Sequence, residues 1–197
     1  SFHSLIRFNF IKAILIIAVV CALMMSVFVS FLPSLAAMIN VNAFHVGAIL
    51  SMGIFLAGIL QVPFGRIADS HDLNGKLIQI GIGTSIGMLA LFVMPLCPDF
   101  AALMAAASFV GLGAAVASPA LTSVSVGIGK KTGMGSWMGI FQCAMSIGFV
   151  VTPLVAGIVM DRLGIEAVFY TLAICAFFGA LSYLRYVLRR IHGYKIG

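Results

Sequence analysis

Residues 13–35 read AILIIAVVCALMMSVFVSFLPSL, an apolar run without a single charged side chain. A helix needs about 20 such residues to cross about 30 Å of hydrocarbon. Five further runs of similar length follow, and each predicts a transmembrane helix, because lipid cannot satisfy an open backbone. The predicted spans cover residues 13–35, 46–64, 77–96, 100–126, 137–160 and 167–188. The predicted fold class is an all-α membrane protein whose six transmembrane helices form a single domain over residues 1–197.

The composition excludes a water-soluble globular protein. Hydrophobic residues make up 62% of the chain and charged residues 8%, whereas charged residues are about a quarter of typical soluble domains. The sequence shows no glycine-rich phosphate loop, no nucleophile paired with a base and no cluster of metal ligands. It therefore predicts neither an enzyme nor a protein with a cofactor or a bound metal.

The basic residues are unevenly distributed along the chain. All but one of the 11 Lys and Arg residues precede the first span, follow the second or the fourth, or close the sixth; the exception is Arg162. Cytoplasmic segments of membrane proteins collect Lys and Arg. Both termini are therefore predicted to be cytoplasmic, in a bacterial inner membrane or a plasma membrane. This bias and contact with anionic lipid explain the net charge of +6, and no nucleic-acid partner is predicted.

The first three spans resemble the last three. The second span is followed by residues 65–69 (GRIAD), and the fifth ends in residues 157–161 (GIVMD), so each closes with Gly, three residues and Asp. Pro33 and Pro119 occupy corresponding late positions in the first and fourth spans. Because three is odd, the second triplet crosses the membrane in the opposite direction to the first. The sequence predicts two inverted three-helix repeats.

Inverted triplets joined into six helices resemble one half of a major facilitator transporter. Residues 65–69, followed by Gly75 and Lys76, are similar to the family's cytoplasmic signature, usually written G-x-L-A-D-R-x-G-R-K, although residues 70–74 depart from it. In the family, the matching aspartate interacts with the positive end of a helix in the other half. The resemblance implies a conformational motif, with Asp69 as its latch, at Gly65, Arg66, Asp69 and Lys76. The alternative is a solvated loop that only sets orientation.

The fifth span carries a second resemblance to the same family. Its small residues follow the spacing of the antiporter motif G-x8-G-x3-G-P-x2-G-G, with Thr152 and Ala156 in place of two glycines. The matching positions are Gly139, Gly148, Pro153 and Gly157. The resemblance implies that these residues support the helix bending of alternating access. Close packing of helices through small residues is an equal alternative.

Three features favour the second half of a twelve-helix transporter. Residues 70–74 are a degenerate version of the signature, Ala107 stands where drug/proton antiporters keep an arginine, and the chain does not begin with Met. The fifth-span motif belongs mainly to first halves and favours the opposite assignment. We expect helices seven to twelve, with the N-terminal six-helix half as the missing partner.

The candidate substrate residues are polar side chains within the spans. In the family, the first, second, fourth and fifth helices of a half line the cavity, so the resemblance implies that a small-molecule substrate contacts Ser30, Gln61, Gln142 and Ser146. Five aromatic side chains are candidates for apolar lining or for simple packing: Phe28, Phe31, Phe55, Phe141 and Phe149. No span has a charged residue near its middle. An ionisable group for proton coupling is therefore expected in the other half.

The predicted function is secondary active transport of a small molecule by alternating access. The resemblance is to proton- or cation-coupled efflux antiporters of drugs or metabolites. Two alternatives remain: a membrane-embedded scaffold or regulatory module without transport, and a channel-like half that pairs with a copy of itself.

Overall fold

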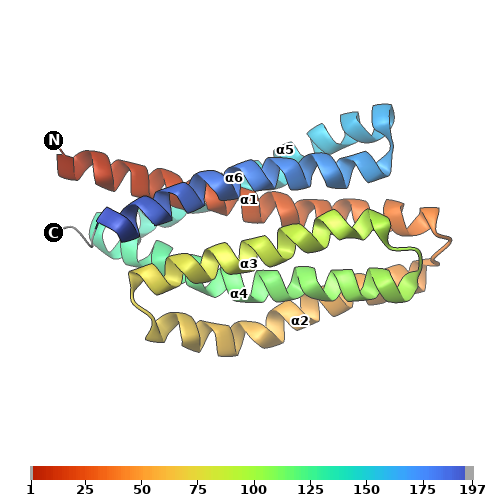
Figure 1. The fold of residues 1–197 in the computed structure, drawn as a ribbon, viewed down its shortest axis with the longest axis horizontal. Coiled ribbons are helices and arrows are strands. Elements are labelled where there is room, and N and C mark those ends of the chain that lie inside the picture. The colour runs from red at the N-terminus through yellow and green to blue at the C-terminus, as the bar shows by residue number, and fades with distance from the viewer. Residues whose placement is uncertain (1, 194–197) are drawn as a thin grey trace.

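The computed structural model describes residues 2–193, and the side chains of residues 9–188, as a bundle of long helices (Figure 1). The helices are α1 (Phe2–Met38), α2 (Ala43–Ser70), α3 (Leu73–Val93), α4 (Phe100–Thr132), α5 (Met134–Leu163) and α6 (Ile165–Gly193), and the 3₁₀ turn η1 (Met94–Leu96) follows α3. Each long helix contains a stretch long and apolar enough to cross a membrane. The predicted all-α fold with six spans is confirmed.

Most helices continue beyond the predicted spans. The second helix runs on from residue 64 to Ser70 and the fourth from residue 126 to Thr132, because a helix extends through the polar interface beyond the hydrocarbon. The third helix ends early, at Val93. Pro95 has no N–H to donate, and the chain there forms the 3₁₀ turn instead.

Short side chains and glycines fix the helix ends. Asn42, Asp72 and Asp99 cap α2, α3 and α4, each accepting a hydrogen bond from the backbone N–H three residues later, at 3.0, 2.9 and 2.8 Å. Gly133 and Gly164 separate α4 from α5 and α5 from α6. Their φ angles are 106° and 87°, which glycine adopts without a steric penalty. These turns let each helix reverse direction within a few residues.

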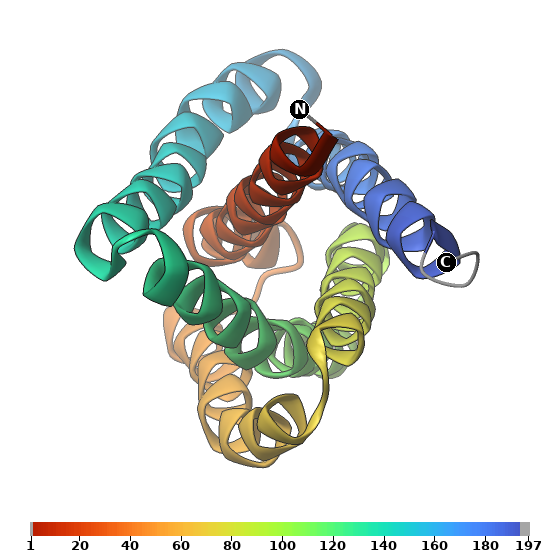
Figure 2. The ribbon, with the colours of Figure 1, turned by 90° about the vertical axis from the view of Figure 1, so that its left-hand side faces the viewer.

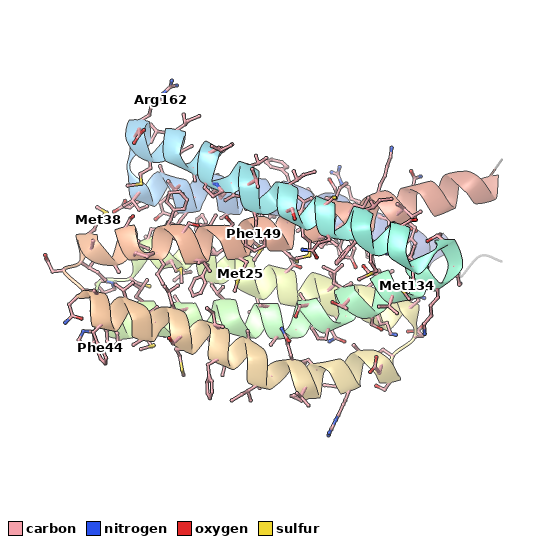
Figure 3. All side chains as sticks on the ribbon, turned by 180° about the vertical axis from the view of Figure 1, so that it is seen from behind. Met25, Met38, Phe44, Met134, Phe149 and Arg162 are labelled. Atoms are coloured by element: carbon pink, nitrogen blue, oxygen red, sulfur yellow. The ribbon has the colours of Figure 1, made fainter. Side chains whose placement is uncertain are left out.

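The helices alternate in direction, so the loops gather at two ends of the bundle. Met38, Phe44 and Arg162 lie at one end, and Met134 lies at the other (Figure 3). The beginning of α1 and the end of α6 lie at the same end of the bundle (Figure 1), which is the end that holds Met134 in Figure 3. The two ends of the described chain are therefore on the same side of the predicted membrane.

The packing repeats between the two triplets. The first helix packs mainly on α5 and α6, and α4 packs mainly on α2 and α3, while α3 and α6 contact each other. Exchanging the triplets converts the α1–α5 and α1–α6 pairings into the α4–α2 and α4–α3 pairings and leaves the α3–α6 pairing unchanged. Figure 2 shows α3 and α6 together on one side of the bundle, with α1 and α4 in the middle. In Figure 3, which views the bundle from behind relative to Figure 1, α2 and α5 lie towards the viewer.

Glycines let the backbones of α4 and its neighbours approach closely. A Cβ atom at Gly113 would lie 2.6 Å from the nitrogen of Gly87 and 2.7 Å from the carbonyl oxygen of Gly83, both in α3. A Cβ atom at Gly111 would collide with the backbone of Gly53 in α2. Small residues are typical of helix crossings in membranes, where van der Waals contact replaces the hydrophobic effect.

The six helices contribute unequally to the interior. Within the most apolar 18-residue window, 56% of the α1 residues are buried, but only 17% of those in α2 and in α5. The second and fifth helices therefore leave most of their surface uncovered by the rest of the described chain.

Candidate functional site

The four predicted substrate residues are all exposed. Ser30 lies in α1, Gln61 in α2, and Gln142 and Ser146 one turn apart in α5. The Gln61 amide donates a 3.1 Å hydrogen bond to the hydroxyl oxygen of Ser118 in α4. The other three make no hydrogen bond within the part of the chain that the structure describes.

A groove between α2 and α4 contains one of these four residues. It has a volume of about 780 Å³, and its polar lining comes from α2, α3 and α4: Gln61, Asp69, Lys76, Ser118, Thr122, Ser123 and Lys130. We call it the α2–α4 groove. Ser30, Gln142 and Ser146 do not line it, so the structure does not bring all four predicted substrate residues into one pocket of this chain.

Three of the four residues of the predicted conformational signature line this groove: Gly65, Asp69 and Lys76, but not Arg66. Gly65 lies opposite Pro119 of α4, where an added Cβ would be 3.8 Å from the Cβ of the proline. Arg66 and Asp69 are exposed, and Asp69 has no hydrogen-bond or ion-pair partner among the described residues. The Lys76 ammonium group donates a 2.8 Å hydrogen bond to the Ser123 hydroxyl and so ties the start of α3 to α4.

The four matching positions in α5 fall into two groups. Gly148 packs inside the bundle, where an added Cβ would be 2.9 Å from the carbonyl oxygen of Val19 in α1. Gly139 and Gly157 have no heavy atom within 4 Å of an added Cβ, and Pro153 is half-buried. Gly148 therefore serves close packing within this chain, while Gly139 and Gly157 present open small-residue surface.

The aromatic candidates also divide. Phe28, Phe31 and Phe141 are buried in the hydrophobic core, so for these three the packing interpretation is correct. Phe55 and Phe149 are exposed, by 63% and 43%. Only these two are available to line a cavity on the uncovered side.

Gln79 is an intramembrane polar residue that the sequence interpretation missed. It is only 6% exposed, and its amide nitrogen donates to the carbonyl oxygens of Phe64 in α2 and Val116 in α4, at 3.0 and 3.1 Å. Val116 follows Ala115, the residue whose carbonyl Pro119 leaves without its usual helical N–H donor. A glutamine within an apolar run is the one signal that could have identified it, since a buried amide requires partners.

Comparison with known proteins agrees with this architecture. The model of the Major Facilitator Superfamily matches residues 14–195. An uncharacterized MFS-type transporter of Methanocaldococcus jannaschii is 28% identical over 138 residues, which are 70% of this chain and 34% of that protein. A probable L-galactonate transporter of Escherichia coli is 25% identical over 154 residues, or 78% of this chain and 33% of that protein.

A third relative is the multidrug resistance protein Stp of Mycobacterium tuberculosis, 32% identical over 104 residues, which are 52% of this chain and 19% of that protein. The aligned segments thus span between 19% and 34% of the length of these relatives. The family and these relatives are transporters and not enzymes. With its family match over nearly the whole length and its bundle of six apolar helices, the chain belongs to the Major Facilitator Superfamily.

Proposed function

We propose that this chain is the second six-helix half of a secondary transporter that moves a small molecule across a membrane by alternating access. The observation that carries the proposal is a set of exposed polar side chains on α1, α2 and α5: Ser30, Gln61, Gln142 and Ser146. An amide facing hydrocarbon without a partner costs several kcal/mol. These groups are therefore better explained by a polar cavity, enclosed between this chain and a second six-helix half, than by contact with lipid.

The two conformational motifs support the same arrangement. Gly139 and Gly157 leave open surface on α5, which lets a helix of the other half approach closely. Asp69 is exposed near the end of α2, where its charge is available to the positive N-terminal end of a helix in that half. Pro153 lies inside α5, and a proline at such a position favours a bend of the helix. In this proposal the two halves rock about the cavity and Asp69 latches one of the end states.

The finer part of the proposal is cation- or proton-coupled efflux by an antiporter mechanism. It is supported by the match of four positions in α5 to the antiporter motif. The chain has no charged residue near the middle of its spans, so the coupling residue is placed in the other half. With both ends of the described chain at the lysine-rich end of the bundle, the proposal places the termini in the cytoplasm of a bacterial inner membrane or plasma membrane.

The test is gradient-driven movement of a broad compound panel by the full-length native protein in proteoliposomes. We expect movement that requires the proton gradient and that falls strongly in Asp69→Asn and in Gly157→Leu. Asp72→Asn is the matched control, because it removes a charge from the same loop while Asn retains the cap of α3. A folded protein that moves no compound under any gradient would contradict the proposal and favour a scaffold; gradient-independent leakage would favour a channel.

A further inference from the structure

The α2–α4 groove contains two serine hydroxyls whose oxygens already accept a hydrogen bond. Ser118 accepts from the Gln61 amide at 3.1 Å, and Ser123 accepts from the Lys76 ammonium group at 2.8 Å. Ser108 and Thr152 instead donate to the carbonyl four residues back in their own helix. No such donation is made by Ser118 or Ser123 within the described residues. The O–H groups of these two serines are therefore available to a bound acceptor.

The charged groups of the groove have an excess of positive charge. Lys76 and Lys130 line it together with a single carboxylate, that of Asp69. Lys76 is half-buried and uses one of its three N–H groups on Ser123, so two remain for a ligand. Because Coulomb attraction strengthens away from bulk water, this combination of ammonium and hydroxyl donors favours an oxyanion.

The groove also has acceptors for a ligand that carries hydroxyl groups. The side-chain oxygen of Gln61 and the carboxylate of Asp69 line the same space and accept no hydrogen bond from the described residues. Ser118 and Ser123 are five residues apart on α4, a rise of about 7.5 Å. A ligand with an anionic group at Lys76 and Ser123 thus places its remaining length beside Ser118 and Gln61.

We propose that the α2–α4 groove binds a small hydroxylated carboxylate. The carboxylate lies against Lys76, Ser123 and Lys130, and the hydroxyl groups pair with Ser118 and Gln61. The inference rests on the proposed transport function, since the ligand is taken to be a substrate at the end of the bundle that holds the start of α1 and the end of α6.

The experiment measures binding of gluconate to the full-length native protein in phosphatidylcholine nanodiscs by calorimetry. Glucose is the uncharged control ligand. We expect gluconate but not glucose to bind, and we expect Lys130→Gln and Ser123→Ala to weaken gluconate binding, each by about tenfold for the loss of one charge-assisted hydrogen bond. Lys131→Gln is the matched control, because it removes the same charge from the next residue, which does not line the groove. Lys130 is exposed, so its replacement does not threaten folding.

Two results would overturn the inference: no gluconate binding by the unaltered protein, or equal losses in Lys130→Gln and Lys131→Gln. Two further results would assign the groove to a phosphate group and so contradict the inference. One is binding of inorganic phosphate without binding of gluconate. The other is a Lys130-dependent affinity for phosphatidylglycerol nanodiscs without binding of gluconate. Binding and transport are measured separately. A protein that moves an uncharged compound in liposomes but binds no gluconate keeps the transport proposal and loses this one. Gluconate binding without any transport contradicts the transport proposal and, with it, the assignment of gluconate as a substrate, and leaves only a binding site.

Discussion

The hydroxyl of Ser26 in α1 donates a 3.4 Å hydrogen bond to the backbone carbonyl of Phe149 in α5. That carbonyl lies four residues before Pro153, whose nitrogen has no hydrogen to donate, so α5 itself leaves it without its usual partner. Ser26 is 2% exposed, and hydrocarbon offers no water in its place. A side chain of one helix thus compensates for the proline of another.

We predict that Ser26→Ala lowers the free energy of unfolding by about 1 kcal/mol, the usual net value of one hydrogen bond. In a Pro153→Ala background the same change should cost less, because the N–H of Ala at position 153 can bond the Phe149 carbonyl. A double-mutant cycle, measured by reversible unfolding in detergent, isolates this coupling. Equal costs of Ser26→Ala in the two backgrounds would show that the serine does not compensate for the proline.

Ser85→Ala is the control for this cycle. Ser85 is exposed, and its hydroxyl donates to the carbonyl of Gly81 within its own helix, at 2.8 Å. A bond of this kind competes with the helix and adds little to it. The variant should stay within about 0.5 kcal/mol of the unaltered protein.

Two glycine-to-alanine changes, one at the α3–α4 crossing and one on the open surface of α2, should have opposite effects on stability. Gly113→Ala should destabilise the protein by about 1–3 kcal/mol, because the new methyl group would lie 2.6 Å from the backbone nitrogen of Gly87 and the helices would have to separate. Gly47→Ala in α2 meets nothing within 4 Å and should stabilise by up to about 1 kcal/mol through helix propensity. Thermal unfolding of the two variants side by side provides the check; destabilisation by both would point to a general intolerance of alanine.

Hydropathy predicts the helices of this protein well for a physical reason. Residues such as those of 13–35 have no soluble alternative, and a lipid-facing backbone has to satisfy its own hydrogen bonds. The direction in which a side chain points is a different matter. Gln79 is visible in the sequence as a polar residue within an apolar run, but only the packing of the helices places its amide against carbonyl oxygens of α2 and α4.

The glycines of α5 also show that the sequence predicts a helix but not which of its faces is buried. Gly139 and Gly148 are nine residues apart, which is about two and a half helical turns, and so they lie on opposite faces, whereas Gly139 and Gly157 share a face. This relation follows from the sequence. Which face enters the bundle does not, because that depends on contacts with α1, and the structure places Gly148 there.

The thiol of Cys97, between η1 and α4, should react slowly at neutral pH. Burial raises the pKa of Cys97 above its ordinary value, and the negative charge of Asp99 raises this pKa further. Since the thiolate is the reactive form, labelling by a maleimide should accelerate as pH increases through the raised pKa. Asp99→Asn removes the charge, lowers the pKa and should increase the rate at a given pH, while Asn still caps α4.

The rate has to be measured in a protein whose other cysteines, Cys21, Cys143 and Cys175, are replaced by alanine. An unchanged thermal unfolding temperature in Asp99→Asn serves as the control, because fraying of α4 would also expose the thiol. A slower reaction in Asp99→Asn than in the unaltered protein at the same pH would contradict the electrostatic account.

The two ends of the bundle should differ in their accessibility from outside the cell. Phe44 lies at the end that holds Arg162 (Figure 3), and Ser136, in the first turn of α5, lies at the end that holds Met134; both are exposed. Because Lys130 and Lys131 lie just before α5 and basic residues collect in the cytoplasm, we predict that Phe44→Cys reacts with a membrane-impermeant maleimide in intact cells. Ser136→Cys, in the same cysteine-free background, should react only after the membrane is permeabilised. The reverse pattern would invert the proposed orientation and move the α2–α4 groove to the outer surface.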